Sequence, residues 1–323
     1  MKFGIGIYGN NGHQIHGLLE NHQKAELIAT SAFDTNLLPE NLKKRDIRNY
    51  KTLEEMLRDP KIDIVSLCSP MRAEQAGDAI KCMKGGKHVY AEKPCALTEY
   101  DLDRVIKTSY ETGKIFHEMA GTAFDQPYQT IRRVVNSNVI GTVIQVLAQK
   151  SYPYFDGRPQ DEKIDGGLLC QAGVHAARFI EHVAGVRIKD IYAIETNLGN
   201  PKQNGGLKMA VSCMISLENG GVACFIANYL NPRAFGSWGN ETLRIFGNKG
   251  FIETVDGGAR TRLVLNEKDM GTLDISGTPV DYFDIFIGEL DGTDQTDQMP
   301  FSIEDELHPT RMVIKAKERC GNL

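Results

Sequence analysis

The first 120 residues alternate between short apolar runs and amphipathic stretches, and this alternation limits the possible folds more than any other feature of the chain. Apolar runs with strand character occupy residues 3–8, 25–33, 62–70, 87–94 and 114–121. Stretches with helical spacing and capping residues lie between them, at 52–59, 72–86 and 98–113. A repeated strand, crossover helix and parallel strand is the pattern of a doubly wound α/β domain. We therefore predict a parallel sheet that closes near Gly121.

The second half has a different pattern, in which paired apolar runs flank short turns. Asn219-Gly220 separates the runs 209–217 and 221–230, and Asn-Gly between two such runs is a strong hairpin signal. Two more hairpins are expected, from 242–247 with 250–255 and from 261–266 with 271–276. Helical spacing at 126–137 and 174–185 completes an α+β domain with a large, mostly antiparallel open sheet. The chain is thus predicted to form two domains, 1–121 and 122–323, with a polar loop at 288–300.

Charge and apolar content narrow the possible partners to a small molecule. The net charge is −5 and no basic block is present, which argues against nucleic acid. No run of about 18 apolar residues occurs, so a membrane partner is not expected. The chain starts directly with a glycine-rich strand rather than a signal peptide, and its seven cysteines include no C-x-x-C pair. We therefore expect a reduced, cytoplasmic protein without a metal site.

The glycine-rich start, "GIGIYGNNGHQIHG", contains two possible registers for a dinucleotide-binding turn. The literal G-x-G-x-x-G match begins at Gly4, and only three residues precede it, so no strand can come before that turn. The run 3–8 fits the first strand, and the turn then begins at Gly9 and is expected to open a helix. In this register Asn11 and Gln14 stand where further glycines belong, and an ordinary Gly/Asn turn is the alternative. The predicted cofactor-binding residues of the turn are Gly9, Asn10, Asn11, Gly12 and His13.

Further cofactor-binding candidates follow the other strands, because ligands bind beyond the carboxyl ends of strands in open α/β sheets. Asp34 is the only carboxylate about 20 residues beyond the turn, where an acid can bind the ribose; a surface-loop acid is the alternative. No arginine follows directly to hold a 2′-phosphate, so NAD is favoured and NADP remains possible. Ser69-Pro70 and Glu92-Lys93-Pro94 end two later strands and complete this set of candidates.

Lys93 is the most informative of these residues. It ends a buried strand, and Pro94 fixes the chain directly after it. A lysine held there can orient a substrate hydroxyl and stabilise alkoxide character on its oxygen. The alternative is a lysine whose ammonium group merely reaches solvent.

Several motifs carry a resemblance to one family. The stretch "AGDAIKCMKGGKHVYAEKPCALT" resembles the segment of the glucose–fructose oxidoreductase, inositol dehydrogenase and rhizopine catabolism protein family (Gfo/Idh/MocA) that ends in E-K-P. "GGLLCQAGVHAARFIEHVAG" is similar to the family's G-G-x-L-x-D-x-G-x-H-x-x-D helix start. "DIVSLCSP" and "ETLRIFGNKGFIE" extend the resemblance over most of the chain.

The resemblance implies a Rossmann domain with a nicotinamide cofactor and hydride transfer to or from a secondary alcohol, usually of a sugar or polyol. It also implies homo-oligomers, dimers or tetramers, built through the open C-terminal sheet. The E-K-P lysine corresponds to Lys93 and the motif histidine to His175, which is the usual acid/base of the family. Gln171 and Arg178 replace the two motif aspartates. Gln171 is then expected to hydrogen-bond to the substrate or to His175.

Additional substrate-facing residues are expected at and after the end of 142–152, the first predicted strand of the second domain. Ordinary exposed loop side chains are the alternative for this group, which comprises Lys150, Tyr152, Tyr154 and Arg158. Two other functions stay open beside the dehydrogenase: a non-catalytic cofactor or ligand sensor on the same fold, and a lyase or hydrolase that keeps NAD tightly bound. Retention of Lys93 and His175 favours an enzyme, whereas the altered glycine turn favours the sensor.

Overall fold

The computed structural model describes residues 2–293 and 301–320, which form two compact units. The first unit comprises residues 2–120, 163–165, 282–293 and 301–307. The second comprises residues 121–162, 166–281 and 308–320. Among the described residues, no helix combines the length and the apolar character needed to cross a bilayer.

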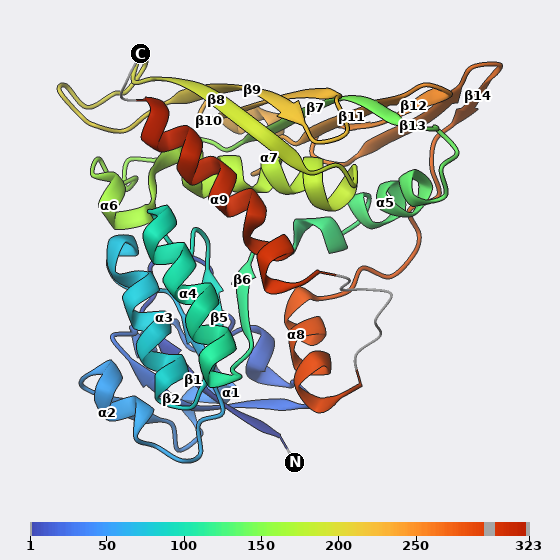
Figure 1. Ribbon diagram of the computed structural model, residues 1–323. Helices are drawn as coiled ribbons and strands as arrows, with labels where there is room; N and C mark the ends of the chain where they lie inside the picture. The colour runs from blue at the N-terminus through green and yellow to red at the C-terminus, as the bar shows by residue number, and fades with distance from the viewer. Residues whose placement is uncertain (1, 294–300, 321–323) are drawn as a thin grey trace. The chain divides into compact units, whose positions relative to one another are not determined.

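A six-stranded parallel sheet forms the centre of the first unit (Figure 1). Its spatial order is β3-β2-β1-β4-β5-β6, so the direction of winding reverses between β1 and β4. This order is that of a dinucleotide-binding sheet, and the reversal creates a crevice at the carboxyl ends of the two central strands. The predicted doubly wound domain is confirmed, with β1 (Phe3–Tyr8), β2 (Ala25–Ser31), β3 (Arg48–Tyr50), β4 (Ile64–Leu67), β5 (His88–Glu92) and β6 (Phe116–Met119).

Local capping signals set the ends of the helices in the first unit. The Thr52 hydroxyl accepts a hydrogen bond from the Glu55 amide at 3.1 Å, and Thr98 does the same for Asp101. The helix after Thr98 ends at Gly113, whose φ of 63° suits a glycine. Thr52 thus caps α2 (Leu53–Leu57), and Thr98 caps α4 (Glu99–Thr112). The other helices of this region are α1 (Glu40–Lys43) and α3 (Gln75–Lys84), and α3 packs beside α4 (Figure 1).

The helix expected directly after the Gly9 turn is absent, and this corrects the sequence prediction. Residues 9–17 form an irregular loop that leads into a single 3-10 turn, η1 (Leu18–Glu20). The next regular element is β2. Side-chain hydrogen bonds of Asn11 and Gln14, rather than helical backbone hydrogen bonds, hold the loop in place.

The first unit also takes up a segment that the expected domain boundaries assigned to the second half. Helix α8 (Tyr282–Asp291) packs its aromatic side chains on β5, where Phe283 and Phe286 each lie 5.4 Å from the Tyr90 ring centroid. Residues 288–291, expected to be loop, are the end of this helix, and residues 294–300 of that predicted loop lie outside the described residues. Helix α9 (Ile303–Cys320) begins in the first unit and continues in the second.

The second unit is built on an eight-stranded, mostly antiparallel sheet, as predicted. Its order is β14-β13-β12-β11-β7-β10-β9-β8, and β7 and β10 are its parallel pair. The Asn219-Gly220 hairpin joins β9 to β10. The strands are β7 (Val143–Ser151), β8 (Ile188–Thr196), β9 (Ala210–Leu217), β10 (Val222–Asn228), β11 (Thr242–Gly247), β12 (Gly250–Val255), β13 (Arg260–Leu265) and β14 (Lys268–Gly271). The third hairpin differs from expectation, because its second arm is β14 rather than 271–276.

Helices cover one face of this sheet. α5 (Tyr128–Asn136) packs beside a longer helical stretch in which α7 (Val174–Arg178) contacts β7 and β10. Two π-helical segments flank α7, at Leu169–Gly173 and Phe179–Val183. Such segments are rare and are often found at functional sites. The short helix α6 (Glu162–Asp165) precedes this stretch.

Candidate functional site

The loop after β1 lies at the crevice of the parallel sheet, and its backbone N–H groups are largely used within the chain. The Gly9 amide donates to Ser31 O at 3.0 Å, and the Gly12 amide donates to Asn10 O at 3.1 Å. The Asn11 amide approaches the Cys68 carbonyl at 3.4 Å. The loop therefore keeps a fixed shape through contacts with the ends of the neighbouring strands.

The two residues that replace fingerprint glycines bind this loop to the sheet. The Gln14 amide group donates to the Gly9 carbonyl at 2.8 Å and to Tyr8 O at 3.1 Å, and its oxygen accepts from the Ser66 hydroxyl at 2.7 Å. The Asn11 amide group donates to the carbonyls of Ser69, Pro70 and Ile164. Both side chains thus satisfy carbonyls at the edge of the sheet.

Glu92 contacts the loop most closely. Its carboxylate accepts the His13 backbone N–H at 2.8 Å and also lies 3.3 Å from His13 Nδ1. Its side chain packs against Gly12, where a Cβ atom would lie 2.6 Å from Glu92 Cγ. Gly12 has a φ of 128°, which side chains rarely adopt. A carboxylate from β5 therefore lies on the loop that a dinucleotide phosphate is expected to face.

Arg72 and Gln75 hold the loop and the E-K-P segment together. The buried Arg72 guanidinium donates to Asn11 O and to Gln75 Oε1. The Gln75 amide group donates to the carbonyls of Glu92 and Pro94. On the other side, Glu118 Oε1 accepts the Cys95 amide at 2.7 Å. The backbone on both sides of Lys93 is consequently fixed by buried side chains.

Lys93 itself is buried beside Glu92. Its side chain is 3% exposed, and its ammonium nitrogen lies 3.5 Å from Glu92 Oε1. Burial raises the pKa of the Glu92 carboxyl, but Lys93, His13 and Arg72 outweigh burial and hold that pKa below its ordinary value. Glu92 is therefore an anion at neutral pH. This pair places one positive and one negative charge at the end of β5, in the part of the sheet where a ligand is expected.

The remaining cofactor candidates lie at strand ends but use their polar groups internally. The exposed Asp34 caps η2 (Thr35–Leu37), where its carboxylate accepts the Asn36 amide at 3.0 Å. The buried Ser69 hydroxyl donates to Asp78 at 2.9 Å. Asn10 is exposed on the loop. Asp34 remains available from solvent, whereas Ser69 is directed into the protein.

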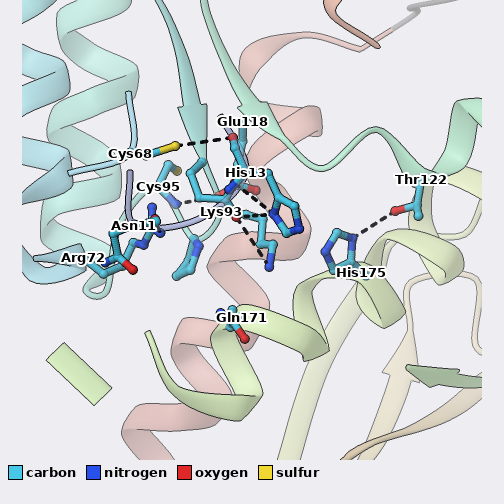
Figure 2. A network of polar contacts seen from close by, with 12 residues as sticks. Asn11, His13, Cys68, Arg72, Lys93, Cys95, Glu118, Thr122, Gln171 and His175 are labelled. Atoms are coloured by element: carbon cyan, nitrogen blue, oxygen red, sulfur yellow. Dashed lines mark hydrogen bonds and ion pairs between the residues drawn. The ribbon is translucent and has the colours of Figure 1, made fainter. Parts of the chain in front are cut away.

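His175 and Gln171 occupy neighbouring turns of the helical stretch in the second unit. His175 is 8% exposed, and its Nδ1 lies 3.0 Å from the Thr122 hydroxyl (Figure 2). Gln171 lies in the first π segment, and its side-chain oxygen accepts the Tyr229 hydroxyl at 2.9 Å. Gln171 is thus hydrogen-bonded to a tyrosine that directly follows β10.

Arg158 lies behind Tyr229. Its guanidinium carbon is 3.6 Å from the centroid of the Tyr229 ring and 4.6 Å from that of Phe155. Such a stack is a favourable cation–π arrangement, and Arg158 is 4% exposed. The chain of contacts from Arg158 through Tyr229 to Gln171 therefore connects a predicted substrate residue with the motif helix.

Lys150 is buried and its charge is already paired. It forms an ion pair with Glu241, and its ammonium lies 5.2 Å from the Tyr152 ring centroid. The Tyr154 hydroxyl is buried, and no hydrogen-bond partner for it is found within the described part of the chain. Of the four predicted substrate residues, Arg158 thus contacts the Tyr229–Gln171 pair through the tyrosine ring.

These observations test whether the first unit fits a nicotinamide dinucleotide. The strand order and its central crevice fit one. The loop, in the arrangement described, does not fit a pyrophosphate. It lacks the helix N-terminus that favours an anion, its Gly9, Asn11, Gly12 and His13 amides donate elsewhere, and the Glu92 anion lies against it.

Sequence reasoning did not identify Arg72, Gln75, Thr122 or Tyr229. Arg72 and Gln75 follow Ser69-Pro70 closely, so their position after a strand end at the crevice was the available signal. Thr122 follows β6 in the same way. Tyr229 had no such signal, because its role depends on contacts with residues far away in the sequence.

Comparisons with known proteins agree with this architecture. Residues 3–119 match the oxidoreductase family with an NAD-binding Rossmann fold, and residues 128–253 match the Gfo/Idh/MocA C-terminal domain. The chain is 24% identical over 222 residues to the myo-inositol 2-dehydrogenase of Thermotoga maritima, covering 68% of this chain and 64% of that protein. It is 27% identical over 183 residues to the scyllo-inositol 2-dehydrogenase (NAD(+)) of Bacillus subtilis, covering 55% and 52%. Each match thus spans less than two thirds of the relative.

Solved structures show the same fold over nearly the whole chain. A putative oxidoreductase from Thermotoga maritima superposes with a TM-score of 0.86 at 22% identity, covering 99% of this chain and 98% of that one. The WlbA dehydrogenase from Chromobacterium violaceum, in complex with NADH and UDP-GlcNAcA, gives 0.83 at 19% identity, covering 99% and 94%. At these identities the likeness establishes the fold alone. With both of its halves matched by the family, the chain belongs to the Gfo/Idh/MocA oxidoreductases, and its N-terminal half to their NAD-binding Rossmann domain.

Proposed function

We propose that this protein is a nicotinamide-dependent oxidoreductase that acts on an alcohol carbon of a sugar, a polyol or a related cyclic substrate. The observation that carries the proposal is Lys93, a buried lysine held at the end of β5 by Gln75 and Glu118, in the position of the family's E-K-P lysine. Relatives named inositol dehydrogenases support the substrate class. Oxidation or reduction of an alcohol needs a hydride acceptor or donor that no side chain supplies, and a bound nicotinamide would supply it.

Two side chains of the chain would handle the alcohol. The Lys93 ammonium can donate a hydrogen bond to the reacting oxygen and stabilise negative charge that develops on it. The His175 imidazole can take up or return the hydroxyl proton near neutral pH. Gln171 is neutral and cannot exchange a proton, so we assign it to binding a hydroxyl. NAD is the favoured cofactor, because Asp34 is available for a ribose hydroxyl.

A second function is favoured by one observation. The loop after β1 donates its amides internally and contacts a carboxylate, which would suit a protein that binds its cofactor weakly and senses it. Turnover of a polyol would distinguish the enzyme from such a sensor. We further propose a cytoplasmic location, since all seven cysteines are free thiols, a state that a reducing compartment preserves.

Cofactor binding is best tested at Asn10. Gly9 is unsuitable, because a Cβ there would lie 2.0 Å from the Cys68 carbonyl oxygen and any variant would distort the fold. Asn10→Glu adds a negative charge to the exposed loop, and Asn10→Lys adds a positive one. Calorimetry with NAD+, NADH and NADP should show weaker binding to Asn10→Glu and equal or tighter binding to Asn10→Lys. Asn197→Glu, in the second unit, is the control for net charge. Equal affinities in all variants would place the cofactor elsewhere or exclude it.

A further inference from the structure

We propose that the Glu92 carboxylate is a built-in occupant of the anion position on the loop after β1, and that it competes there with a cofactor phosphate. The inference rests on the proposed function, since it concerns how the same site admits its cofactor. It goes beyond that function by assigning Glu92 a role in setting affinity. The E-K-P glutamate would then act against cofactor binding rather than support it.

The contact between Glu92 and Gly12 is the first reason. A Cβ atom at position 12 would lie 2.6 Å from Glu92 Cγ, 2.8 Å from Glu92 Cδ and 3.1 Å from an Arg72 nitrogen. No side chain fits there without displacing one of them. A glycine in such a loop ordinarily allows close approach of a phosphate. Here it allows close approach of a carboxylate.

The hydrogen bond to His13 is the second reason. A phosphate on a loop of this kind is bound by backbone N–H groups, and the His13 amide already donates to Glu92 Oε2 at 2.8 Å. A carboxylate presents two anionic oxygens and so resembles part of a phosphate in charge and geometry. Glu92 is 1% exposed, so water screens its charge little. A phosphate at the same amide would meet this anion unless Glu92 turned away.

The cations around Glu92 make the occupied arrangement stable. The Lys93 ammonium lies 3.5 Å from Glu92 Oε1, and Arg72 fixes the loop through the Asn11 carbonyl. The same carboxylate therefore contacts both the loop and the lysine assigned to the alcohol. Because coupling between two sites is reciprocal, movement of Glu92 off the loop would also change the surroundings of Lys93. The Glu92 side chain therefore links cofactor binding to the electrostatic surroundings of the Lys93 ammonium.

The test compares Glu92→Gln with Asp59→Asn in the full-length protein. Both variants replace a buried carboxylate of the first unit by the matching amide, and Asp59 pairs with Arg48 and accepts the Tyr50 hydroxyl. Circular dichroism and thermal melts establish that each variant is folded. Calorimetry with NAD+ should give a Kd for Glu92→Gln at least tenfold lower than for the wild type. Asp59→Asn should keep the wild-type Kd.

A second measurement does not depend on the folding of a variant. In the wild-type protein, saturation with NAD+ should shift both the His13 backbone amide and the Glu92 carboxyl carbon in NMR spectra, because the two groups separate. An unchanged Glu92 resonance at saturation overturns the proposal. The proposal is also overturned if the wild type binds NAD+ tightly and Glu92→Gln does not bind it more tightly. That outcome leaves the proposed function intact. Failure of every variant to bind NAD+ or NADH overturns both.

Discussion

The imidazole of His117 lies between two carboxylates, with its Nδ1 2.5 Å from Glu306 and its Nε2 2.7 Å from Glu289. His117 and Glu306 are buried, and the Tyr282 hydroxyl also donates to Glu306 at 2.7 Å. These contacts fix α8 and the first turn of α9 to β6 within the first unit. Burial lowers the pKa of His117, but the Glu306 and Glu289 carboxylates outweigh burial and raise the pKa to about 9.

The raised pKa of His117 predicts a loss of stability in mild alkali. Below about pH 6.5, the ordinary pKa of histidine, His117 is charged in both the folded and unfolded chain and its contribution is complete. Between pH 6.5 and about 9 the folded chain keeps a proton that the unfolded chain loses, so the free energy of unfolding falls as pH rises. The total fall is on the order of 3 kcal/mol. Urea unfolding at several pH values measures it.

Two variants separate this effect from other titrations in the same range. His117→Gln should lower stability at pH 6 and show a smaller fall between pH 6.5 and 9 than the wild type. Tyr282→Phe removes an uncharged partner of Glu306 and should lower stability by a similar amount at every pH. If His117→Gln and the wild type lose stability in parallel as pH rises, His117 is not the group responsible.

Thr122 is predicted to position His175. Its hydroxyl lies 3.0 Å from His175 Nδ1, so it can fix the ring orientation and the tautomer without adding charge. Thr122→Val should shift the ring-nitrogen resonances of His175 and alter the pH profile of kcat, and Thr122→Ser should restore both. A merely structural threonine would leave the ring resonances and the pH profile unchanged in the valine variant.

The two groups assigned to the alcohol should differ kinetically from the group assigned to binding. Lys93→Ala and His175→Ala should each lower kcat by about 10²- to 10⁴-fold, the usual contribution of a positioned acid or base. Tyr229→Phe removes the hydroxyl that donates to Gln171 but keeps the ring beside Arg158. It should raise KM with little change in kcat, as loss of uniform binding does. Steady-state kinetics on a polyol substrate decides this, and near-normal kcat in His175→Ala would remove His175 from the chemical step.

We predict that the exposed face of the eight-stranded sheet binds a second copy of the chain. Tyr192, Met214, Cys224 and Leu147 form one row across β8, β9, β10 and β7. Met214 is 76% exposed and Ile194, on the same face, 71%. Exposed apolar side chains gathered in this way usually mark an interface.

Light scattering at micromolar concentration should show an oligomer in the wild type and a smaller species in Met214→Lys with Ile194→Lys. Tyr100→Lys is the matched control, since Tyr100 is 70% exposed and belongs to α4 of the first unit. A wild-type mass near 35.9 kDa would contradict the prediction.

Elements with a local signal were predictable from the sequence. The first strand runs from Phe3 to Tyr8 as expected, and the capping threonines begin their helices where the sequence indicates. β8 was missed, because Lys189 and Asp190 interrupt its apolar alternation. The second arm of the last hairpin, β14, is polar, so apolar content does not reveal it. Its position is determined by the tight turn that follows β13.

For the candidate site, the sequence predicted individual residues but not the contacts between them. Lys93 was predicted from its place at the end of a buried strand and from the E-K-P resemblance, and His175 from motif resemblance, but their neighbours were not predicted. The loop after β1 keeps the first glycine of a helix-opening turn, yet Gln14 and Glu92 hold it through atoms on β4 and β5. Those partners lie 52 and 79 residues away in sequence, and no local pattern encodes such contacts.

The π segments on either side of α7 have a consequence for how this helix tolerates insertions and deletions. A π turn closes with an i→i+5 hydrogen bond and holds one residue more than an α turn spans. Deleting a residue within Leu169–Gly173 would restore α geometry and leave the faces of the flanking turns nearly unchanged, because the π turn already accommodates the extra residue. Loss of Gln171 itself would bring a neighbouring residue toward Tyr229 while His175 stayed beside Thr122. A single-codon loss in this stretch is thus a short evolutionary step by which a descendant of the chain could exchange the group that accompanies its histidine.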